Sequence, residues 1–415
     1  MAVVTEGASM TLHVLCVGGE DHALRIPFLS ALRSRGFRVS AAGTGAAVPF
    51  SKSGIEYHGY DFDRFGARIA DRMAIGQLSQ LVQGIRPDVV QTFDTKPNLL
   101  APLAIRGTVP VVRTINGMGW VFSSAHLKAL ALRPVYLALQ RLAACWTAAT
   151  VFQNTADSRF FRRYRLLGNS RAVLIGSSGI DVGAFEAAQV QTVSIAKLRA
   201  ELSLGDSEVV LTVSRLTVQK GIPTLLEAAA IVHAVRPGVR FLLVGPRESE
   251  GPFAVDQASI DRYAPYVIAL GARSDVPALL GLADVFACPT EYREGIPRVL
   301  LEAGLAGVPM VATRVPGCDD VVVKNWNGHL VPQRDPRALA AAILDLLQDP
   351  ARARAMGQRS IELVRREFDL NVVADRYADL YRQLLSTGRS SDDQTVPSHD
   401  DHEHRAANLH SSKIS

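Results

Sequence analysis

The sequence predicts an α/β protein made of two doubly wound domains that face each other across a cleft. Two series of short, apolar, strand-like runs alternate with helical patterns along the chain, and strands separated by helices of this length favour parallel sheets with right-handed crossovers. A chain of 415 residues exceeds a single hydrophobic core, which favours two domains. Ligands of such sheets bind beyond the carboxyl ends of the strands, so the expected site lies between the domains.

Ten strand-like runs, five in each half of the chain, carry this prediction. The first series lies at 12–17, 37–42, 88–92, 109–114 and 149–153, and the second at 209–213, 241–245, 267–270, 285–288 and 309–313. Helical patterns separate most of them, beginning with an amphipathic stretch from Ile26 to Arg35. The alternation persists through both halves, which is typical of two sheets in tandem.

Composition and periodicity divide the chain into segments. Apolar residues recur at helical spacing from 370 to 385, which predicts a terminal helix. Beyond it the chain turns to Ser, Asp, His and Gly with few apolar residues, which is typical of disorder. We expect an N-terminal extension (1–10), a first domain (11–185), a linker (186–206), a second domain (207–369), a helix that packs back on the first domain (370–386) and a disordered tail (387–415).

Composition also restricts the compartment and the partners. No apolar stretch of 18 residues lacks a charge, which argues against a transmembrane helix, and the first residues lack the basic start and apolar core of a secretory signal. The four cysteines have no metal-ligand or redox spacing, which suits a reducing cytosol. The net charge of +5 favours anionic lipid or a phosphorylated substrate over nucleic acid, because no aromatic-basic nucleic-acid module is present.

Two carboxylates, Glu294 and Glu302, are separated by seven residues and follow the strand-like run at 283–289. Pro297 suits a first helical position and Gly307 suits a C-terminal stop, so Glu294 is expected in a loop and Glu302 on the helix that follows. Helix-start N–H groups can bind phosphate while the carboxylates accept sugar hydroxyls. Taken alone, the pair also fits two solvated glutamates near a helix start.

Cations follow two other strand ends of the second half. Arg215 and Lys220 leave the run at 209–213 on a short loop, where a forked guanidinium and an ammonium can converge on a diphosphate. Arg273 follows the run at 267–270, where main-chain groups can pair with a nucleobase edge. Alone, each of these is also consistent with surface cations or a turn. Pro316-Gly317-Cys318 and Asn327-Gly328 are interpreted as turns.

In this order and spacing, the motifs from Val209 to Asp335 closely resemble glycosyltransferase family 4. These are retaining, nucleotide-sugar-dependent enzymes of the GT-B type, with two Rossmann-like domains. The resemblance implies that the second domain binds the donor: Arg215 and Lys220 hold its diphosphate, Glu294 contacts the transferred sugar and Glu302 binds the ribose. It also implies that main-chain groups around Gly295 and Ile296 meet the phosphates and the sugar. The catalytic assignments are therefore Glu294, Arg215 and Lys220.

The first half resembles one bacterial subgroup of the family, which extends lipid-diphosphate-linked sugars for capsule, O-antigen or exopolysaccharide. The segments that carry this resemblance are Arg86–Val90, Thr95–Pro97, Thr114–Gly119, Phe152–Asn154 and Gly176–Asp181. The resemblance implies a UDP-sugar donor and a polyprenyl-diphosphate-linked saccharide as acceptor, bound on the side of the first domain. It places Gly18 and Gly19 near the donor phosphates, and Lys96 is a weak candidate for the acceptor phosphate. Asn116 stands where many relatives have histidine, so an acid or base role does not transfer to it.

The expected chemistry needs neither a metal nor another cofactor. Fixed cations and helix N–H groups can stabilise the charge of the leaving diphosphate, and we expect the leaving phosphate to take the acceptor proton. Asp61-Phe-Asp63 has the letters of a metal motif but is interpreted as a solvated loop. The cluster from Ser398 to His404 is interpreted in the same way as a solvated tail.

A basic and apolar stretch predicts contact with an anionic membrane. The segment 120–146 mixes apolar residues with Lys128, Arg133 and Arg141, and four further arginines follow it, at Arg159, Arg162, Arg163 and Arg165. Such a surface can lie on an anionic bilayer, which gives a cytoplasmic enzyme, peripheral at the inner face of the cytoplasmic membrane. A helix packed on the sheet with its charges in solvent is the alternative.

Three other functions can be compared with the sequence. A nucleotide-sugar epimerase or hydrolase of GT-B fold would use a similar arrangement of two domains. A non-catalytic nucleotide-sugar-binding protein predicts loss of the Arg, Lys and Glu set, which is intact. A NAD-dependent oxidoreductase would need Gly-x-Gly-x-x-Gly after the first strand, and the segment from Val17 to His22 does not supply it.

Overall fold

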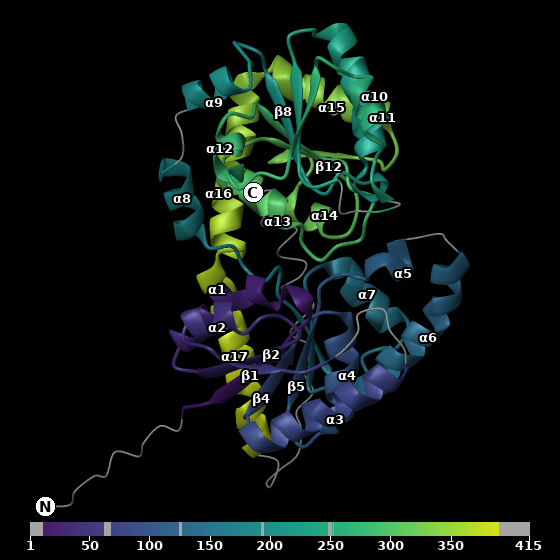
Figure 1. The fold of residues 1–415 in the computed structure, drawn as a ribbon, viewed down its shortest axis with the longest axis vertical. Coiled ribbons are helices and arrows are strands. Elements are labelled where there is room, and N and C mark those ends of the chain that lie inside the picture. The colour runs from purple at the N-terminus through teal and green to yellow at the C-terminus, as the bar shows by residue number, and fades with distance from the viewer. Residues whose placement is uncertain are drawn as a thin grey trace, which may run out of the picture.

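The computed structural model describes residues 11–61, 68–123, 127–191, 195–247, 251 and 253–389. They form two lobes, one above the other, and each lobe contains a parallel sheet with helices around it (Figure 1). The predicted α/β class with two doubly wound halves is confirmed. The predicted N-terminal extension, the tail from 390 onward with its cluster from Ser398 to His404, and Phe62 and Asp63 of the Asp-Phe-Asp run lie outside the described residues.

The N-terminal lobe contains a sheet of seven described strands in the order β3-β2-β1-β4-β5-β6-β7. They are β1 (His13–Val17), β2 (Arg38–Gly43), β3 (Glu56–Gly59), β4 (Val89–Thr92), β5 (Val111–Ile115), β6 (Ala149–Phe152) and β7 (Arg171–Leu174). The five central strands match the predicted runs to within two residues. The edge strands β3 and β7 were missed, because each carries exposed residues at both ends and lacks a continuous apolar run.

The C-terminal lobe contains a second parallel sheet, with six described strands in the order β10-β9-β8-β11-β12-β13. They are β8 (Val209–Val213), β9 (Arg240–Val244), β10 (Val267–Gly271), β11 (Val285–Cys288), β12 (Met310–Thr313) and β13 (Gly328–Val331). The prediction missed β13, since Asn327-Gly328 was interpreted as a turn. Gly328 instead begins the strand, and a Cβ there would lie 2.4 Å from the carbonyl oxygen of Met310 on the neighbouring strand.

Both sheets reverse their strand order once, between β1 and β4 and between β8 and β11. At such a point the connections leave toward opposite faces, so a crevice opens beyond the carboxyl ends of the two central strands. The loops after β8 and β11 carry Arg215, Lys220 and Glu294, and those after β1 and β4 carry Gly18, Gly19 and Lys96. The fold therefore brings predicted site residues together in two groups, one in each lobe.

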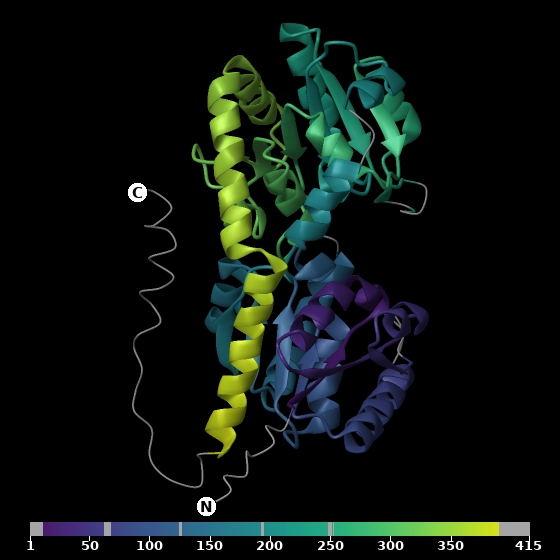
Figure 2. The ribbon, with the colours of Figure 1, turned by 90° about the vertical axis from the view of Figure 1, so that its left-hand side faces the viewer.

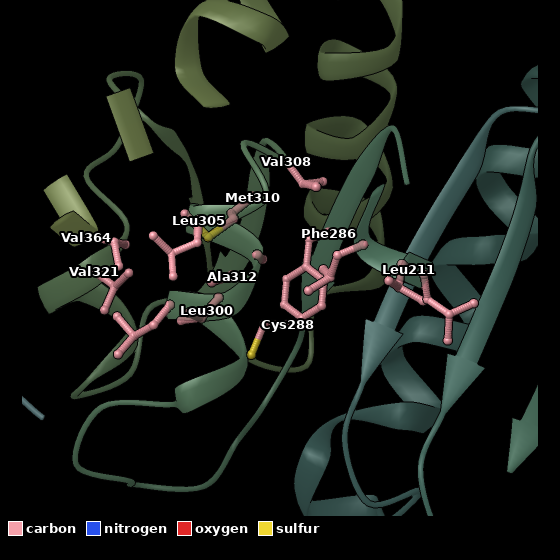
Figure 3. Close-up of a cluster of buried hydrophobic side chains, with 14 of the residues drawn as sticks. Leu211, Phe286, Cys288, Leu300, Leu305, Val308, Met310, Ala312, Val321 and Val364 are labelled. Atoms are coloured by element: carbon pink, nitrogen blue, oxygen red, sulfur yellow. The ribbon is translucent and has the colours of Figure 1, made fainter. Parts of the chain in front are cut away.

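Helix α13 (Arg298–Leu305) is held against the C-terminal sheet by buried apolar side chains. Leu211, Phe286 and Met310 extend from β8, β11 and β12 toward Leu300 and Leu305 of the helix (Figure 3). All five are at most 6 % exposed, and burying each such side chain contributes about 1.5–3 kcal/mol. The helix that follows the Glu294 loop thus has a fixed position.

The chain passes between the lobes near Ile180 and returns near Leu370. The amide of Ile180 donates to the carbonyl of Phe368 and the amide of Leu370 donates to the carbonyl of Ile180, both at 2.9 Å. The segment predicted as a linker, 186–206, instead contains most of α8 (Val182–Gln191) and all of α9 (Ile195–Glu201). Leu198 and Leu204 are buried in the C-terminal core, so this segment packs as part of the second lobe.

The terminal helix α17 (Leu370–Arg389) packs on the N-terminal lobe, below α16 (Pro350–Glu367), which lies along the other lobe (Figure 2). Tyr377 and Tyr381 are fully buried in the N-terminal core. The hydroxyls of Tyr377 and Thr114 lie 3.0 Å apart, and the hydroxyl of Tyr381 donates to Gln91 at 2.9 Å. The helix continues three residues past the predicted end at 386.

The remaining helices surround the two sheets. They are η1 (Glu20–Arg25), α1 (Ile26–Arg33), α2 (Val48–Lys52), α3 (Arg68–Ile85), α4 (Thr95–Ile105), α5 (Gly119–Ser123), α6 (Leu127–Ala144), α7 (Thr155–Arg163), η2 (Val218–Lys220), α10 (Ile222–Val235), α11 (Gln257–Asp261), α12 (Val276–Gly281), α14 (Cys318–Val321) and α15 (Pro336–Gln348). Within the described part of the chain, none of the helices combines the length and apolar character needed to cross a bilayer.

Candidate active site

A cavity of about 220 Å³ lies beyond the carboxyl ends of β8 and β11, at the reversal point of the C-terminal sheet. The three predicted catalytic residues, Arg215, Lys220 and Glu294, all line it. Other lining residues include Ser214, Thr290, Pro297 and Arg298. Two cations and a carboxylate thus line one cavity, although up to 79 positions separate them in the sequence.

Lys220 and Glu294 form an ion pair, with 16 % and 24 % of their side chains exposed. The turn that carries Lys220 continues into Gly221, whose φ is +71°. A Cβ at Gly221 would lie 2.0 Å from the carbonyl oxygen of Pro289, so only glycine lets this turn approach the end of β11 so closely. The close approach brings the ammonium group to the carboxylate.

A second cavity, of about 260 Å³, adjoins the first and shares Val213, Ser214, Arg215 and Val299 with it. Arg273 lines this second cavity. Its guanidinium pairs with Asp275 at 2.6 Å and with Glu201 at 3.1 Å. The hydrogen bonds that Arg273 donates to these carboxylates raise its pKa, and the Arg273 guanidinium lowers the pKa of Asp275. Arg273 is thus a fixed cation one cavity away from Glu294.

Glu302 lies one turn along α13 from Arg298, and the two form an ion pair at 3.0 Å. Arg298 lines the first cavity and Glu302 lines neither. The helix begins at Arg298, with Pro297 as its N-cap, so Pro297, predicted as the first helical residue, stands one position before the helix. Arg298 was missed by the sequence prediction, although its position, four residues before Glu302, favours such a pair.

Gly295 and Ile296 follow Glu294 and are both buried. The side chain of Ile296 belongs to the C-terminal core, so only its main chain is left for the predicted ligand contact. A Cβ at Gly295 would lie 1.9 Å from the side-chain oxygen of Gln153, a residue that follows β6 in the other lobe. A side chain at 295 would therefore displace the Gln153 side chain of the other lobe.

The loop around Glu294 contacts the N-terminal lobe. A Cβ at Gly117, after β5, would lie 2.6 Å from the carbonyl carbon of Glu294. The side chain of Asn154 donates to the main-chain oxygen of Glu294 at 3.3 Å. Arg293 pairs at 2.9 Å with Asp157, whose side chain is fully buried. Burial raises the pKa of Asp157, and its hydrogen bond with Asn154 and the nearby Arg293 oppose that shift.

On the N-terminal side, the amides of Gly18 and Gly19 already have acceptors. Gly18 donates to the carbonyl of Ala42 at 2.9 Å, and Gly19 donates to the carboxylate of Asp94 at 3.1 Å. A Cβ at Gly18 would lie 2.1 Å from the ring of His22. The predicted role of the two glycines at the donor phosphates remains a prediction, and it requires these amides to exchange partners.

Asp94 forms hydrogen bonds both with the predicted residue Asn116 and with residues that follow the first strand, β1. The carboxylate of Asp94 accepts from Arg25 at 2.7 Å and from the side-chain amide of Asn116 at 3.3 Å, in addition to Gly19. The backbone of Asp94 has φ +68° and ψ +161°, a region that is essentially restricted to glycine and costs about 1–3 kcal/mol for other residues. Sequence analysis missed Asp94, although it follows a predicted strand and stands two residues before Lys96.

Lys96 lies in the first turn of α4 and pairs with Asp71 of α3 at 2.7 Å. It does not line either of the two cavities described above. A role at an acceptor phosphate would therefore compete with the Asp71 ion pair, and it remains a prediction.

Comparison with known proteins identifies the family. Residues 27–177 match the model of the glycosyl transferase 4-like domain, and residues 207–349 match that of the glycosyl transferases group 1. A GDP-mannose-dependent α-(1-6)-phosphatidylinositol monomannoside mannosyltransferase of Mycolicibacterium smegmatis is 31% identical over 271 residues, 62% of this chain and 68% of that protein. The chain is a family 4 glycosyltransferase. The predicted family and enzyme class are confirmed.

Other relatives of this family 4 glycosyltransferase are similar over more of its length. An N,N'-diacetylbacillosaminyl-diphospho-undecaprenol α-1,3-N-acetylgalactosaminyltransferase of Campylobacter jejuni is 26% identical, over 74% of this chain and 80% of that protein. HepE of Anabaena, solved in complex with UDP-glucose, superposes with a TM-score of 0.73 at 20% identity, covering 90% of this chain and all of that chain. The structural similarity shows that the glycosyltransferase has the GT-B fold.

Proposed function

We propose that this glycosyltransferase moves a hexosyl or N-acetylhexosaminyl group from a UDP-sugar to a polyprenyl-diphosphate-linked saccharide, with retention, during synthesis of a bacterial surface polysaccharide. The observation that carries the donor part is the convergence of Arg215, Lys220 and Glu294 on one cavity at the reversal point of the C-terminal sheet. Two cations match a diphosphate, and a carboxylate matches the hydroxyls of a sugar.

The reaction breaks the bond between the anomeric carbon and the diphosphate oxygen and forms a bond to the acceptor oxygen. Negative charge accumulates on the leaving diphosphate, and the acceptor proton passes to a leaving phosphate oxygen. Arg215 and Lys220 stabilise that charge, and removing one such group typically costs about 3 kcal/mol. Glu294 holds the ammonium of Lys220 at the cavity wall and binds the transferred sugar. No metal is assigned a role in this proposal.

Arg273 extends the donor site into the second cavity, and Glu302 adjoins the first cavity through its partner Arg298. Binding of a ribose by Glu302 requires its carboxylate to exchange or share the partner Arg298. Arg273 stands in the second cavity, where main-chain groups after β10 pair with the base. Glu294 in the first cavity, Arg215 in both and Arg273 in the second match a sugar, a diphosphate and a nucleoside in that order.

The acceptor is proposed from the relatives and from the surface of the N-terminal lobe. The Campylobacter relative and a UDP-Gal:α-D-GlcNAc-diphosphoundecaprenol α-1,3-galactosyltransferase of Escherichia coli, 25% identical over 76% of this chain, are named for undecaprenol-linked acceptors. A lipid-linked acceptor stays at a bilayer surface, so an enzyme that uses it gains from a face that binds the membrane.

Helix α6, at the outer edge of the N-terminal lobe beside α5 and α7 (Figure 1), offers such a face. Six large aliphatic side chains on this one helix are between 38% and 80% exposed: Leu127, Leu130, Leu132, Val135, Leu139 and Leu142. Most recur every three or four residues and so lie on one side of the helix. These exposed side chains form an apolar stripe, hereafter the α6 stripe, which supports the membrane alternative and which we assign to the membrane.

Exposed arginines flank one end of the α6 stripe. Arg162 and Arg163 end α7, and Arg165 follows them. Arg141 of α6 donates to the main-chain oxygen of Tyr164 at 2.9 Å, which holds this basic corner against the helix. Each cation near an anionic surface contributes about 1 kcal/mol, so the combined apolar and basic surface suits the cytoplasmic face of a membrane.

Flotation with phosphatidylglycerol-containing liposomes tests the membrane assignment. The wild type should float at low salt, and a Val135→Glu/Leu139→Glu variant should not. Val235→Glu, at an aliphatic residue of the C-terminal lobe that is more exposed than either (68%), serves as the control and should float. No flotation of the wild type at low salt, or equal flotation of all three proteins, would remove the membrane from the proposal.

Thermal stabilisation by a panel of UDP- and GDP-linked hexoses and N-acetylhexosamines tests the donor site, because bound ligand raises apparent stability. A UDP-sugar should give the largest shift, and the shift should fall in Glu294→Gln and Lys220→Ala. A larger shift with a GDP-sugar would change the assigned base, as in the mycobacterial relative's name. Full transfer activity in both variants would contradict the site assignment.

The two alternatives make different predictions for the same protein. An epimerase or hydrolase would convert the nucleotide sugar without acceptor, whereas the proposed transferase releases the nucleoside diphosphate only with acceptor. A non-catalytic binding protein would show the thermal shift and no turnover with any acceptor.

A further inference from the structure

We propose that Asp94 is a positioning residue that fixes the side-chain amide of Asn116, so that the Oδ1 atom of Asn116 accepts a hydrogen bond from a hydroxyl of the reacting sugars. The inference rests on the proposed function, since it names a contact within the same transfer. It assigns a task to two residues of the N-terminal lobe, and neither task depends on proton transfer by Asn116.

The orientation of the amide follows from hydrogen-bond chemistry. Nδ2 of Asn116 lies 3.3 Å from Oδ1 of Asp94. An ionised carboxylate only accepts hydrogen bonds and an amide nitrogen only donates them, so the nitrogen must face Asp94. The amide oxygen of Asn116 is therefore turned away from the carboxylate.

That oxygen is buried and has no hydrogen-bond partner among the residues that the structure describes. Leaving a buried acceptor unpaired is unfavourable, and such atoms in folded proteins call for a ligand, a water or a catalytic role as explanation. The amide cannot relieve the problem by turning over, because Asp94 would then face an oxygen. Asp94 therefore keeps an acceptor available beside the Glu294 loop.

The location of Asn116 connects this acceptor to the chemistry. Its main-chain carbon would lie 3.1 Å from a Cβ at Gly295, and the next residue, Gly117, abuts the main chain of Glu294. Oδ1 thus belongs to a residue whose main chain meets the Glu294 loop of the other lobe, close to the residue assigned to the transferred sugar.

The geometry of Asp94 itself supports a task beyond holding the fold. Its carboxylate accepts hydrogen bonds from Gly19, Arg25 and Asn116, and its backbone stands in a region suited to glycine. Strained backbone of this kind is concentrated at functional sites, where the position of a side chain outweighs local stability. Three elements of the N-terminal lobe meet at this one strained carboxylate.

The variant Asp94→Gly provides the first test, because glycine adopts this backbone without strain and removes only the carboxylate. We expect kcat to fall at least tenfold, while the thermal midpoint and the affinity for UDP stay near the wild-type values. The matched control is Arg106→Gly, which likewise places glycine at a positive φ, +48°, at the other end of α4 and should leave kcat unchanged.

Asn116→Asp provides the second test through its pH profile. It keeps an oxygen at the place of Oδ1 and puts a second carboxylate oxygen at the place of Nδ2, facing Asp94. Two carboxylates cannot both ionise at contact distance. Activity should therefore rise as the pH is lowered and the pair takes up a shared proton, whereas the wild type lacks this acidic limb. A merely structural role of Asn116 would not produce such a profile.

Two measurements distinguish which hydroxyl is bound. If Oδ1 binds a hydroxyl of the donor, Asp94→Gly should weaken binding of the stabilising nucleotide sugar but not of UDP. If it binds a hydroxyl of the acceptor, Asp94→Gly should raise KM for the lipid-linked acceptor but not for the nucleotide sugar. Wild-type kcat and KM in Asp94→Gly, or activity lost only in step with the thermal midpoint, would overturn the inference and leave a water on Oδ1. Failure of the proposed function would look different, since no nucleotide sugar would then stabilise the wild type.

Discussion

Replacing Gly117 by alanine should disable transfer while leaving the fold almost as stable as before. The added Cβ would lie 2.6 Å from the carbonyl carbon of Glu294 and 2.7 Å from the nitrogen of Gly295, where ordinary contacts are 3.4–4 Å. The Glu294 loop must therefore retreat by about 1 Å, and a misplacement of that size at a reacting group costs about 100-fold in rate. Because the clash lies between the lobes, parting of the lobes relieves it without unfolding either one.

The neighbouring glycine supplies the control. Gly119 also has a positive φ, +61°, but its added Cβ would meet only the Tyr292 hydroxyl, at 3.6 Å. Both alanine variants should lose about 1 kcal/mol or slightly more of folding free energy from the backbone conformation. Steady-state release of nucleoside diphosphate, measured beside urea unfolding, separates the two effects: kcat/KM should fall about 100-fold for Gly117→Ala and only a few-fold for Gly119→Ala. Equal activity losses in the two variants would refute the reasoning.

Two further predictions concern the N-terminal lobe. Burial, followed by the charge of Arg25, lowers the pKa of His22 from 6.5 to about 4. As the pH falls, the unfolded chain therefore takes up a proton before the folded chain does. The free energy of unfolding should drop by up to about 3 kcal/mol between pH 6.5 and 4. Urea unfolding at pH 7 and pH 4 should show a smaller difference for His22→Gln, and an identical difference would contradict this assignment. Tyr377→Phe removes the buried contact with Thr114 and should cost about 1 kcal/mol without changing kcat, since Thr114 still accepts from Gln91; a fall in kcat at unchanged stability would show that α17 does more than hold the lobe.

The central strands of both sheets could be predicted because they are buried on both faces and form continuous apolar runs. Edge strands such as β3 have one exposed side and mixed composition, so periodicity does not detect them. A local sequence pattern is also insufficient for the segment 186–206, which was predicted as a linker. Leu198 and Leu204 are spaced like residues of any short surface helix, and only the tertiary structure shows that they pack in the C-terminal core.

Some residues of the site could also be predicted from local sequence patterns, and others could not. Arg215, Lys220 and Glu294 leave strand ends that share one edge of a sheet, so the rule for parallel sheets is sufficient to group them. The contacts of Asp94 with Gly19, Arg25 and Asn116 join loops whose relative register no local pattern encodes. The approach of Gly117 and Gln153 to the Glu294 loop depends on how the two lobes meet, which is equally beyond local pattern.

Acceptor-dependent release of nucleoside diphosphate tests the central claim most directly. The assay combines the stabilising nucleotide sugar with a polyprenyl-diphosphate-linked saccharide, and it compares the wild type with Glu294→Gln. The account predicts release by the wild type only when the acceptor is present, and a loss of about 100-fold or more in the variant. Release without acceptor, or undiminished release by Glu294→Gln, would contradict it.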